Sequence, residues 1–413
     1  MLGRSVFGKV LIFQKVTTYV AAIAAFAMGL GAIFAVGMNS AGATSTDAAS
    51  KVPIPYCLEE PLTGNAASLG LPSEEVATIV VNHLNATGGI DGHKIILNAI
   101  DSLGTAQGGA AAANRAVYVD HCPLISGGFA SVMLATQQVA APAKVLVLND
   151  GGAGTELLRK PYLYDLSPQP PVLAPAGAKW QIAHGVKSIV EIYSDDAYGE
   201  QNASVYKGVF THLGGKVLGM IPFPLGTTDF SAELAQAKSL NPDGYYSVVL
   251  GASQGFLDNQ VASAGLIGKM WMGPLLSGNY KIAGTNENGT ATSGFIGVNP
   301  YVNPNAKSVV QLAKWWAVAY PSTPFSPTLS YLNGYQELEA FVTLEKEAIA
   351  DGLNPLRGSS LLKELNKHPK IPSVSTNQSI TFNLGTHGSN EDIAIQNLVG
   401  NGTTVSTLKL IKS

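Results

Sequence analysis

The segment from residue 189 to residue 266 constrains the fold most, because predicted strands and helices alternate along it. A strand at residues 189–193 leads through a polar loop into a helix that ends at Gly214-Gly215. A second strand at residues 216–223, a second helix and a third strand at residues 245–250 follow. Such alternation predicts right-handed βαβ units and a parallel sheet, with ligands bound beyond the carboxyl ends of the strands.

The same segment carries DDAYGE at residues 195–200, TDFS at residues 228–231 and SAGL at residues 263–266. In this order and spacing the motifs resemble the second lobe of type I periplasmic binding proteins, the leucine/isoleucine/valine-binding family of ABC-transporter receptors. The resemblance extends over about residues 52–410. It implies an α/β fold of two Rossmann-like lobes with parallel sheets, joined by a three-segment hinge.

The resemblance also implies how the chain is divided between the lobes. We expect lobe one to contain residues 52–170 and residues 299–371. Lobe two is expected to contain residues 171–298 and a closing segment at residues 372–413.

Residues 1–43 are expected to direct export as a signal peptide. Three basic residues precede a run without charge at residues 16–46, and Ala41-Gly42-Ala43 is typical of a cleavage site. Residues 19–38 are also about as long as a bilayer span, so a retained membrane anchor is the alternative. Residues 44–51 then form a linker, and either way the globular part is expected in the periplasm or on the extracellular face of the membrane.

Composition excludes some classes of function. Only 13% of the 413 residues are charged and the net charge is -3, so no basic field is available to hold nucleic acid. The chain is long enough for two lobes with separate cores, and 46% hydrophobic residues favour a packed globule over disorder. We expect a monomer.

The chain has two cysteines, Cys57 and Cys122. Export would permit a disulfide between them. However, if Cys57 lies late in the first strand and Cys122 precedes the neighbouring one, four or five residues of about 3.3 Å each separate them. The usual disulfide of the resembled family joins other positions, so we expect two free thiols.

The first predicted strand is followed by Pro61-Leu62-Thr63-Gly64. The resembled family has the same tetrapeptide at the start of its ligand loop, which makes Thr63 a candidate ligand contact. Glu59 and Glu60 precede this loop. We interpret them as solvated loop carboxylates, with ligand contact as the alternative.

A glycine turn, Gly127-Gly128, leads into Phe129, Ala130 and Ser131 at the start of a predicted helix. Backbone N–H groups at a helix start, joined by a serine hydroxyl, favour a carboxylate or carbonyl oxygen. In the resembled family this loop binds the carboxyl or amide end of the ligand, so these three residues are candidate contacts. The alternative is that Ser131 only caps the helix.

The loop after the fourth predicted strand begins at Asp150 and continues through glycines to Thr155. Only its position matches the resembled family, whose usual sequence here is serine-proline-alanine-threonine. Glycines allow close approach of the backbone, so Asp150, Gly152 and Thr155 are further candidate contacts. No Gly-Lys-Ser/Thr follows, which excludes a phosphate-binding loop of that type.

The candidate contacts in lobe two follow from the resemblance, in which Tyr198 matches the ligand-side tyrosine. The others are Gly251, Ser253, Leu275 and Ser277.

Amino-acid-binding members of the family have a tyrosine near the first of these four positions and a carboxylate near the third, and both are absent here. A buried ammonium group without a partner is costly. Either Glu59, Glu60, Asp150 or Asp196 therefore pairs with it, or the ligand is an amide, a small carboxylate, an aromatic acid or a urea-like solute.

An enzymatic alternative rests on Gly251-Ala252-Ser253-Gln254-Gly255, a G-x-S-x-G match between a strand and a helix. Ser253 would be the nucleophile, and only His368 and His387 lie downstream as bases. No HGGG-type loop stands upstream, so we prefer a protein without catalytic residues. The chain also lacks H-E-x-x-H, paired-cysteine spacing and GxGxxG after the first strand, so no metal or cofactor is expected.

The sequence therefore predicts an extracytoplasmic solute-binding protein of an ABC importer. It would bind an amino acid, an amide or a small carboxylate between its lobes and deliver it to a permease in the membrane. A membrane-tethered ligand sensor of the same fold is the alternative.

Overall fold

The computed structural model describes residues 51–64, 66–151, 154–249, 252–274, 295–325, 327, 329–399 and 404–412. The predicted export segment at residues 1–43 and all of the linker except Lys51 lie outside these ranges. Among the described residues, no helix has the length and apolar character that crossing a bilayer requires.

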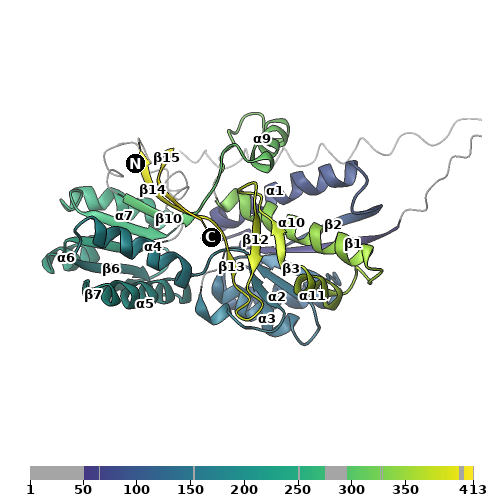
Figure 1. Ribbon diagram of the computed structural model, residues 1–413, viewed down its shortest axis with the longest axis horizontal. Coiled ribbons are helices and arrows are strands. Elements are labelled where there is room, and N and C mark those ends of the chain that lie inside the picture. The colour runs from purple at the N-terminus through teal and green to yellow at the C-terminus, as the bar shows by residue number, and fades with distance from the viewer. Residues whose placement is uncertain are drawn as a thin grey trace, which may run out of the picture. The chain divides into compact units, whose positions relative to one another are not determined.

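A five-stranded parallel sheet forms the first half of the fold, with the strand order β2-β1-β3-β4-β5. Figure 1 labels three of these strands, β1, β2 and β3. Short runs such as LISG and LVLN are buried along their whole length, as expected for strands covered on both faces. The strands are β1 (Lys51–Glu60), β2 (His93–Asp101), β3 (Leu124–Gly127), β4 (Leu146–Asn149) and β5 (Leu163–Asp165).

Helices cover both faces of this sheet, and alternate residues of β1 point to opposite faces. Tyr56 and Leu58 pack against one set of helices, whereas Cys57 faces the other. The first set is α1 (Ala67–Ala86), α9 (Lys307–Ala319), α10 (Leu329–Ala350) and α11 (Gly358–Lys367). The second set is α2 (Ala106–Tyr118) and α3 (Ala130–Ala140).

The second sheet has seven strands in the order β15-β14-β10-β9-β8-β6-β7. The five strands from β10 to β7 pair in parallel, whereas β14 and β15 add an antiparallel edge. Its strands are β6 (Ser188–Ser194), β7 (Lys216–Phe223), β8 (Gly244–Val248), β9 (Met270–Pro274), β10 (Phe295–Pro300), β14 (Ile393–Val399) and β15 (Thr404–Ile411).

Alternate residues of β6 also pack on opposite faces of the second sheet. Val190 and Ile192 face one pair of helices, and Ile189 faces the other. The first pair is α6 (Ser231–Ser239) and α7 (Ala252–Ser263), and the second is α4 (Pro170–Ala183) and α5 (Ala197–His212). The βαβ pattern predicted from residues 189–266 is confirmed, and with it the α/β fold with two lobes.

Smaller elements complete the fold. A short 3-10 helix, η1 (Thr155–Leu157), lies between β4 and β5. An antiparallel three-stranded sheet contains β11 (Lys370–Pro372), β12 (Ser379–Phe382) and β13 (Ser389–Asn390). The chain passes between the two large sheets after β5, after β10 and again between β13 and β14.

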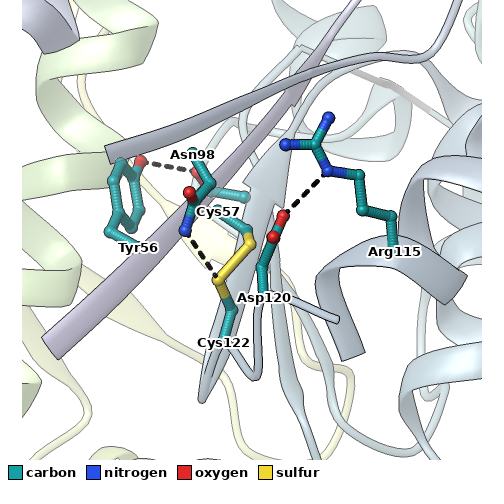
Figure 2. The surroundings of a disulfide bond; sticks show 7 residues. Tyr56, Cys57, Asn98, Arg115, Asp120 and Cys122 are labelled. Carbon is teal, nitrogen blue, oxygen red and sulfur yellow. Dashed lines mark hydrogen bonds and ion pairs between the residues drawn. A yellow bond between two sulfur atoms is a disulfide. The ribbon is translucent and has the colours of Figure 1, made fainter. Parts of the chain in front are cut away.

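Cys57 and Cys122 form a disulfide, with their Cα atoms 5.9 Å apart (Figure 2). The prediction of two free thiols is wrong. It assumed that the residues before the neighbouring strand continue along the axis of that strand, which would leave Cys122 four or five residues away from Cys57. In the structure Cys57 pairs with Ile125, close to the start of the neighbouring strand at Leu124. The backbone turns at His121, where φ is 53°, and brings Cys122 beside β1 instead.

The interpretation of Glu59 and Glu60 as solvated carboxylates is also wrong. Strand β1 continues to Glu60, which pairs with Asp101 of β2. The side chains are 0% and 5% exposed. Thr136 of α3 donates hydrogen bonds to both carboxyl oxygens of Glu59, at 3.0 and 2.8 Å.

Candidate functional site

A small cavity lies where loops from the two sheets meet. Its described lining consists of Phe129, Ala130, Ser131, Gly151, Asp196, Ala197 and Tyr198. The first four follow β3 and β4 of the first sheet, and the last three follow β6 of the second. The cavity therefore lies beyond the carboxyl ends of parallel strands, where α/β folds bind ligands. Its volume of about 10 Å³ holds about one water molecule, so a solute needs the two sides to separate first.

The wall from the first sheet is built from tightly packed backbone. A Cβ atom on Gly128 would lie 3.0 Å from the Cα atom of Gly151, so the turns after β3 and β4 touch and leave no room for a side chain. Phe129 follows with φ 73° and ψ 117°, a conformation that non-glycine residues rarely adopt. Such strain is typical of binding sites whose surroundings fix the backbone.

Helix α3 begins at Ala130, directly behind Phe129. No side chain caps this helix, which excludes the alternative that Ser131 is the cap. Its first N–H groups therefore remain available to an acceptor, and the Ser131 hydroxyl lies beside them in the cavity lining. This wall suits a carboxylate or carbonyl oxygen.

The wall from the second sheet is the start of α5. Asp196 caps this helix, because its Oδ1 accepts hydrogen bonds from the N–H of Gly199 at 2.9 Å and from Ser194 Oγ at 2.8 Å. Tyr198, in the first turn, is 5% exposed. Burial raises the pKa of its phenol far above the usual value, and the charge of Asp196 adds to this, so the hydroxyl stays protonated at neutral pH.

A hydrogen bond connects the two sides next to the cavity. Thr155 Oγ1 of η1 donates to Gln201 Oε1 of α5 at 2.5 Å. The N–H of Gly154 donates to Gln169 Oε1 at 2.8 Å. Thr155 therefore contacts the opposite side of the interface and does not line the cavity.

Asp150 lies behind the cavity wall. It is 5% exposed, and Ser167 Oγ donates a short hydrogen bond to its Oδ1. Asn333 Nδ2 of α10 donates to its backbone oxygen at 2.5 Å. Burial raises the pKa of Asp150 to about 8, although the Ser167 hydrogen bond lowers it, so the carboxyl group is mostly neutral at pH 7.

Asp150 belongs to a cluster of buried carboxyl groups with Glu60, Glu337 and Glu391. Burial is the main cause that raises the pKa of each, and Asp150, when it is ionised, raises the pKa of the other three further. For Glu60 the resulting pKa is about 8. None of the ion pairs among the described residues includes any of the four. Burial therefore favours the protonated form of all four carboxyl groups.

Four of the twelve predicted site residues, Phe129, Ala130, Ser131 and Tyr198, line the cavity together. Thr63 is exposed and bonds to Asp101, and its Oγ1 lies 2.5 Å from Oδ2. Ser253 is buried within α7. The remaining predictions, Gly152, Gly251, Leu275 and Ser277, lie outside the described residues.

Sequence reasoning missed Gly151 and Ala197 as lining residues, and Glu337 and Glu391 as members of the buried cluster. Gly151 and Ala197 are next to predicted contacts, so loop position alone could have found them. Nothing in the local sequence of α10 distinguishes Glu337 from a solvated helical carboxylate. Ser126 Oγ donates to Glu337 Oε2 at 3.1 Å across 211 residues of chain.

The enzymatic alternative names His387 as one of its two possible bases. His387 is engaged elsewhere, because its Nδ1 lies 2.9 Å from the carbonyl oxygen of Lys160 and its ring stacks on Tyr164. Within the described part of the chain, no group of three or more His, Cys, Asp or Glu residues is arranged to hold a metal ion.

Comparison with known proteins gives consistent matches over most of the chain. The profile of a family described as periplasmic binding protein matches residues 58–403. The Leu/Ile/Val-binding protein homolog 3 of Brucella melitensis is 26% identical over 292 residues, which cover 68% of this chain and 75% of the relative.

Two solved structures share the fold. A leucine-binding protein from Thermotoga maritima superposes with a TM-score of 0.74 at 19% identity, covering 87% of this chain and 99% of that one. An ABC-transporter solute-binding protein from Rhodopseudomonas palustris, in complex with 3,4-dihydroxybenzoic acid, gives 0.75 at 22% identity, covering 87% and 97%.

Proposed function

Since this chain belongs to the type I periplasmic binding protein family of the Leu/Ile/Val-binding kind, we propose that it binds a small polar solute between two lobes and delivers it to an ABC-transporter permease. The family also implies a location outside the cytoplasm. We propose further that lobe one comprises residues 52–170 and 299–390, and lobe two residues 171–298 and 391–413. The boundary expected after residue 371 moves because Val374 and Phe382 pack in the core of the first sheet and the chain crosses to the second sheet only after β13.

The observation that carries the proposal is the composition of the cavity wall. One side offers the uncapped N–H groups of α3 and the Ser131 hydroxyl, and the other offers the Tyr198 phenol. A solute that contacts both sides favours the closed arrangement over an open one, because only the closed arrangement makes all of these contacts at once. Closed lobes would then present a combined surface to the permease.

The ligand is an amino acid, an amide or a small carboxylate. The uncapped start of α3 supports an oxygen-bearing end group, since helix N-termini favour carboxylate and carbonyl oxygens. The name of the Brucella relative supports a branched-chain amino acid, whereas the benzoate-type ligand of the Rhodopseudomonas structure supports an aromatic acid.

The test is a thermal-shift screen of the full chain against amino acids, amides and small acids. A solute that binds only the folded state must raise the melting temperature. Affinity for any hit is then measured for Ser131→Ala and Tyr198→Ala, and each is expected to weaken binding at least tenfold without loss of the fold. Matched controls are Ser239→Ala and Tyr118→Ala, because both residues are exposed and lie outside the cavity lining. Unchanged affinity in the first two variants would remove the site.

A further inference from the structure

Four carboxyl groups could balance a positive charge on the solute: Glu59, Glu60, Asp150 and Asp196. The structure separates them by position. Glu59 is fully buried and bonded to Thr136, and Glu60 and Asp150 belong to the buried cluster behind the wall. Only Asp196 lines the cavity.

Asp196 is also the only charged side chain in the described lining of this cavity. Both hydrogen bonds that cap α5 go to Oδ1, so Oδ2 takes no part in the cap. The residue is half-buried, so it is positioned by the protein and still open to the cavity. One oxygen therefore fixes the helix while the other remains available to a donor.

The carboxyl group of Glu156 lies on the opposite side of the interface, where the charge of Asp196 acts on it. Glu156 belongs to η1, beside the Thr155 that bonds to α5. Burial is the main cause that raises the pKa of Glu156, and the negative charge of Asp196 adds to it while Lys160 lowers it. The negative charge of Asp196 therefore acts on Glu156 across the interface. A cation bound beside Asp196 would reduce any repulsion between these two carboxyl groups when the two sides close.

We infer that Asp196 is a specificity-determining residue, which pairs through Oδ2 with a positively charged nitrogen of the solute. This inference rests on the proposed function and narrows its ligand class to amine-bearing solutes, with the oxygen end at α3 and the nitrogen end at α5. An anionic acid without the amine would place its charge near an unpaired carboxylate, which is unfavourable.

The experiment uses matched pairs that differ in the amine: L-alanine with propanoate, L-leucine with 4-methylpentanoate, and L-phenylalanine with 3-phenylpropanoate. Isothermal titration calorimetry on the full wild-type chain is expected to show at least tenfold tighter binding of the amine member in the pair that fits. An acid that binds as tightly as its amine partner would overturn the inference, and this comparison needs no variant.

Asp196→Asn removes the charge and keeps the cap, because Asn and Asp are about equally good at a helix N-cap. It is expected to weaken binding of the amine member at least tenfold and to strengthen binding of the acid, because the unpaired carboxylate is removed. The matched control is Asp229→Asn, which removes a carboxylate at the start of α6 that accepts from the N–H of Ser231 at 3.0 Å. Amine binding by Asp196→Asn at wild-type strength would also overturn the inference.

Failure of the proposed function would give a different result. In that case no amino acid, amide or small acid changes the melting temperature of the wild type. The inference then falls with the function, whereas tight binding of an acid alone removes the inference and leaves solute binding in place.

Discussion

Thr155 and Gln201 form a hydrogen bond that joins a segment attached to the first sheet with a helix attached to the second. The bond lies beside the cavity and includes no lining residue. It can therefore stabilise the closed arrangement without contacting the solute. The remaining question is how much of the affinity depends on it.

Thr155→Val removes the donor and keeps the shape of the side chain. We expect solute affinity to fall about three- to tenfold, because a hydrogen bond contributes about 1 kcal/mol. The preference among solutes should not change, since the cavity lining is intact. Titration calorimetry measures both quantities. Thr227→Val is the control, because Thr227 Oγ1 donates to Pro224 within a single loop. Equal affinities for wild type and Thr155→Val would show that the bond does not hold the closed arrangement.

The buried carboxyl cluster predicts that stability falls as pH rises. The folded-state pKa of Asp150 is raised to about 8, so between about pH 4 and pH 8 the folded protein holds a proton that the unfolded protein has lost. The free energy of unfolding therefore decreases across this range, by at most about 1.4 kcal/mol per pH unit for one group, and levels off above it. Glu60, with a pKa of about 8, acts in the same direction.

Asp150→Asn removes one of these titrations and can still accept from Ser167. Denaturant unfolding at several pH values is expected to give a shallower decrease for this variant. Asp91→Asn is the control, because Asp91 is exposed and its φ of 46° suits Asn. A slope equal to that of the wild type would mean that Asp150 is ionised in the folded protein.

The disulfide predicts a large effect of reducing agents. Cys57 and Cys122 are 65 residues apart, and closing a loop of that length stabilises a fold by about 4 kcal/mol. The double variant Cys57→Ala and Cys122→Ala should lose about this much, and dithiothreitol should lower the melting temperature of the wild type only. Two reactive thiols in the denatured, unreduced wild type would contradict the bond.

The alternation of strands and helices in the sequence predicted both the architecture and part of the cavity. Strands of period two and helices between them imply a parallel sheet, and the carboxyl ends of such strands meet at one edge. Phe129 and Tyr198 follow strands of different sheets, and the structure brings both to one cavity. The resemblance to a known family supplied how the two sheets face each other.

What the sequence could not predict depends on distant parts of the chain. Glu59 and Glu60 look solvated until α3 and α10 cover the two faces of β1. The cysteines look too far apart until the turn at His121 is known. In both cases local pattern located the strand, although it ended β1 before Glu59, and the rest of the error came from contacts that pattern does not report.

The residues that cover the two faces of the first sheet are synthesised at different times. The buried residues on the face that carries the disulfide all lie between 57 and 163, so their core can form soon after they emerge. The opposite face needs residues 306–382, which are made last but for the final strands. While the second sheet is being translated, Tyr56 and Leu58 can therefore be covered by α1 but not by α9, α10 or α11, and apolar surface of the nascent chain stays exposed to aggregation over that interval.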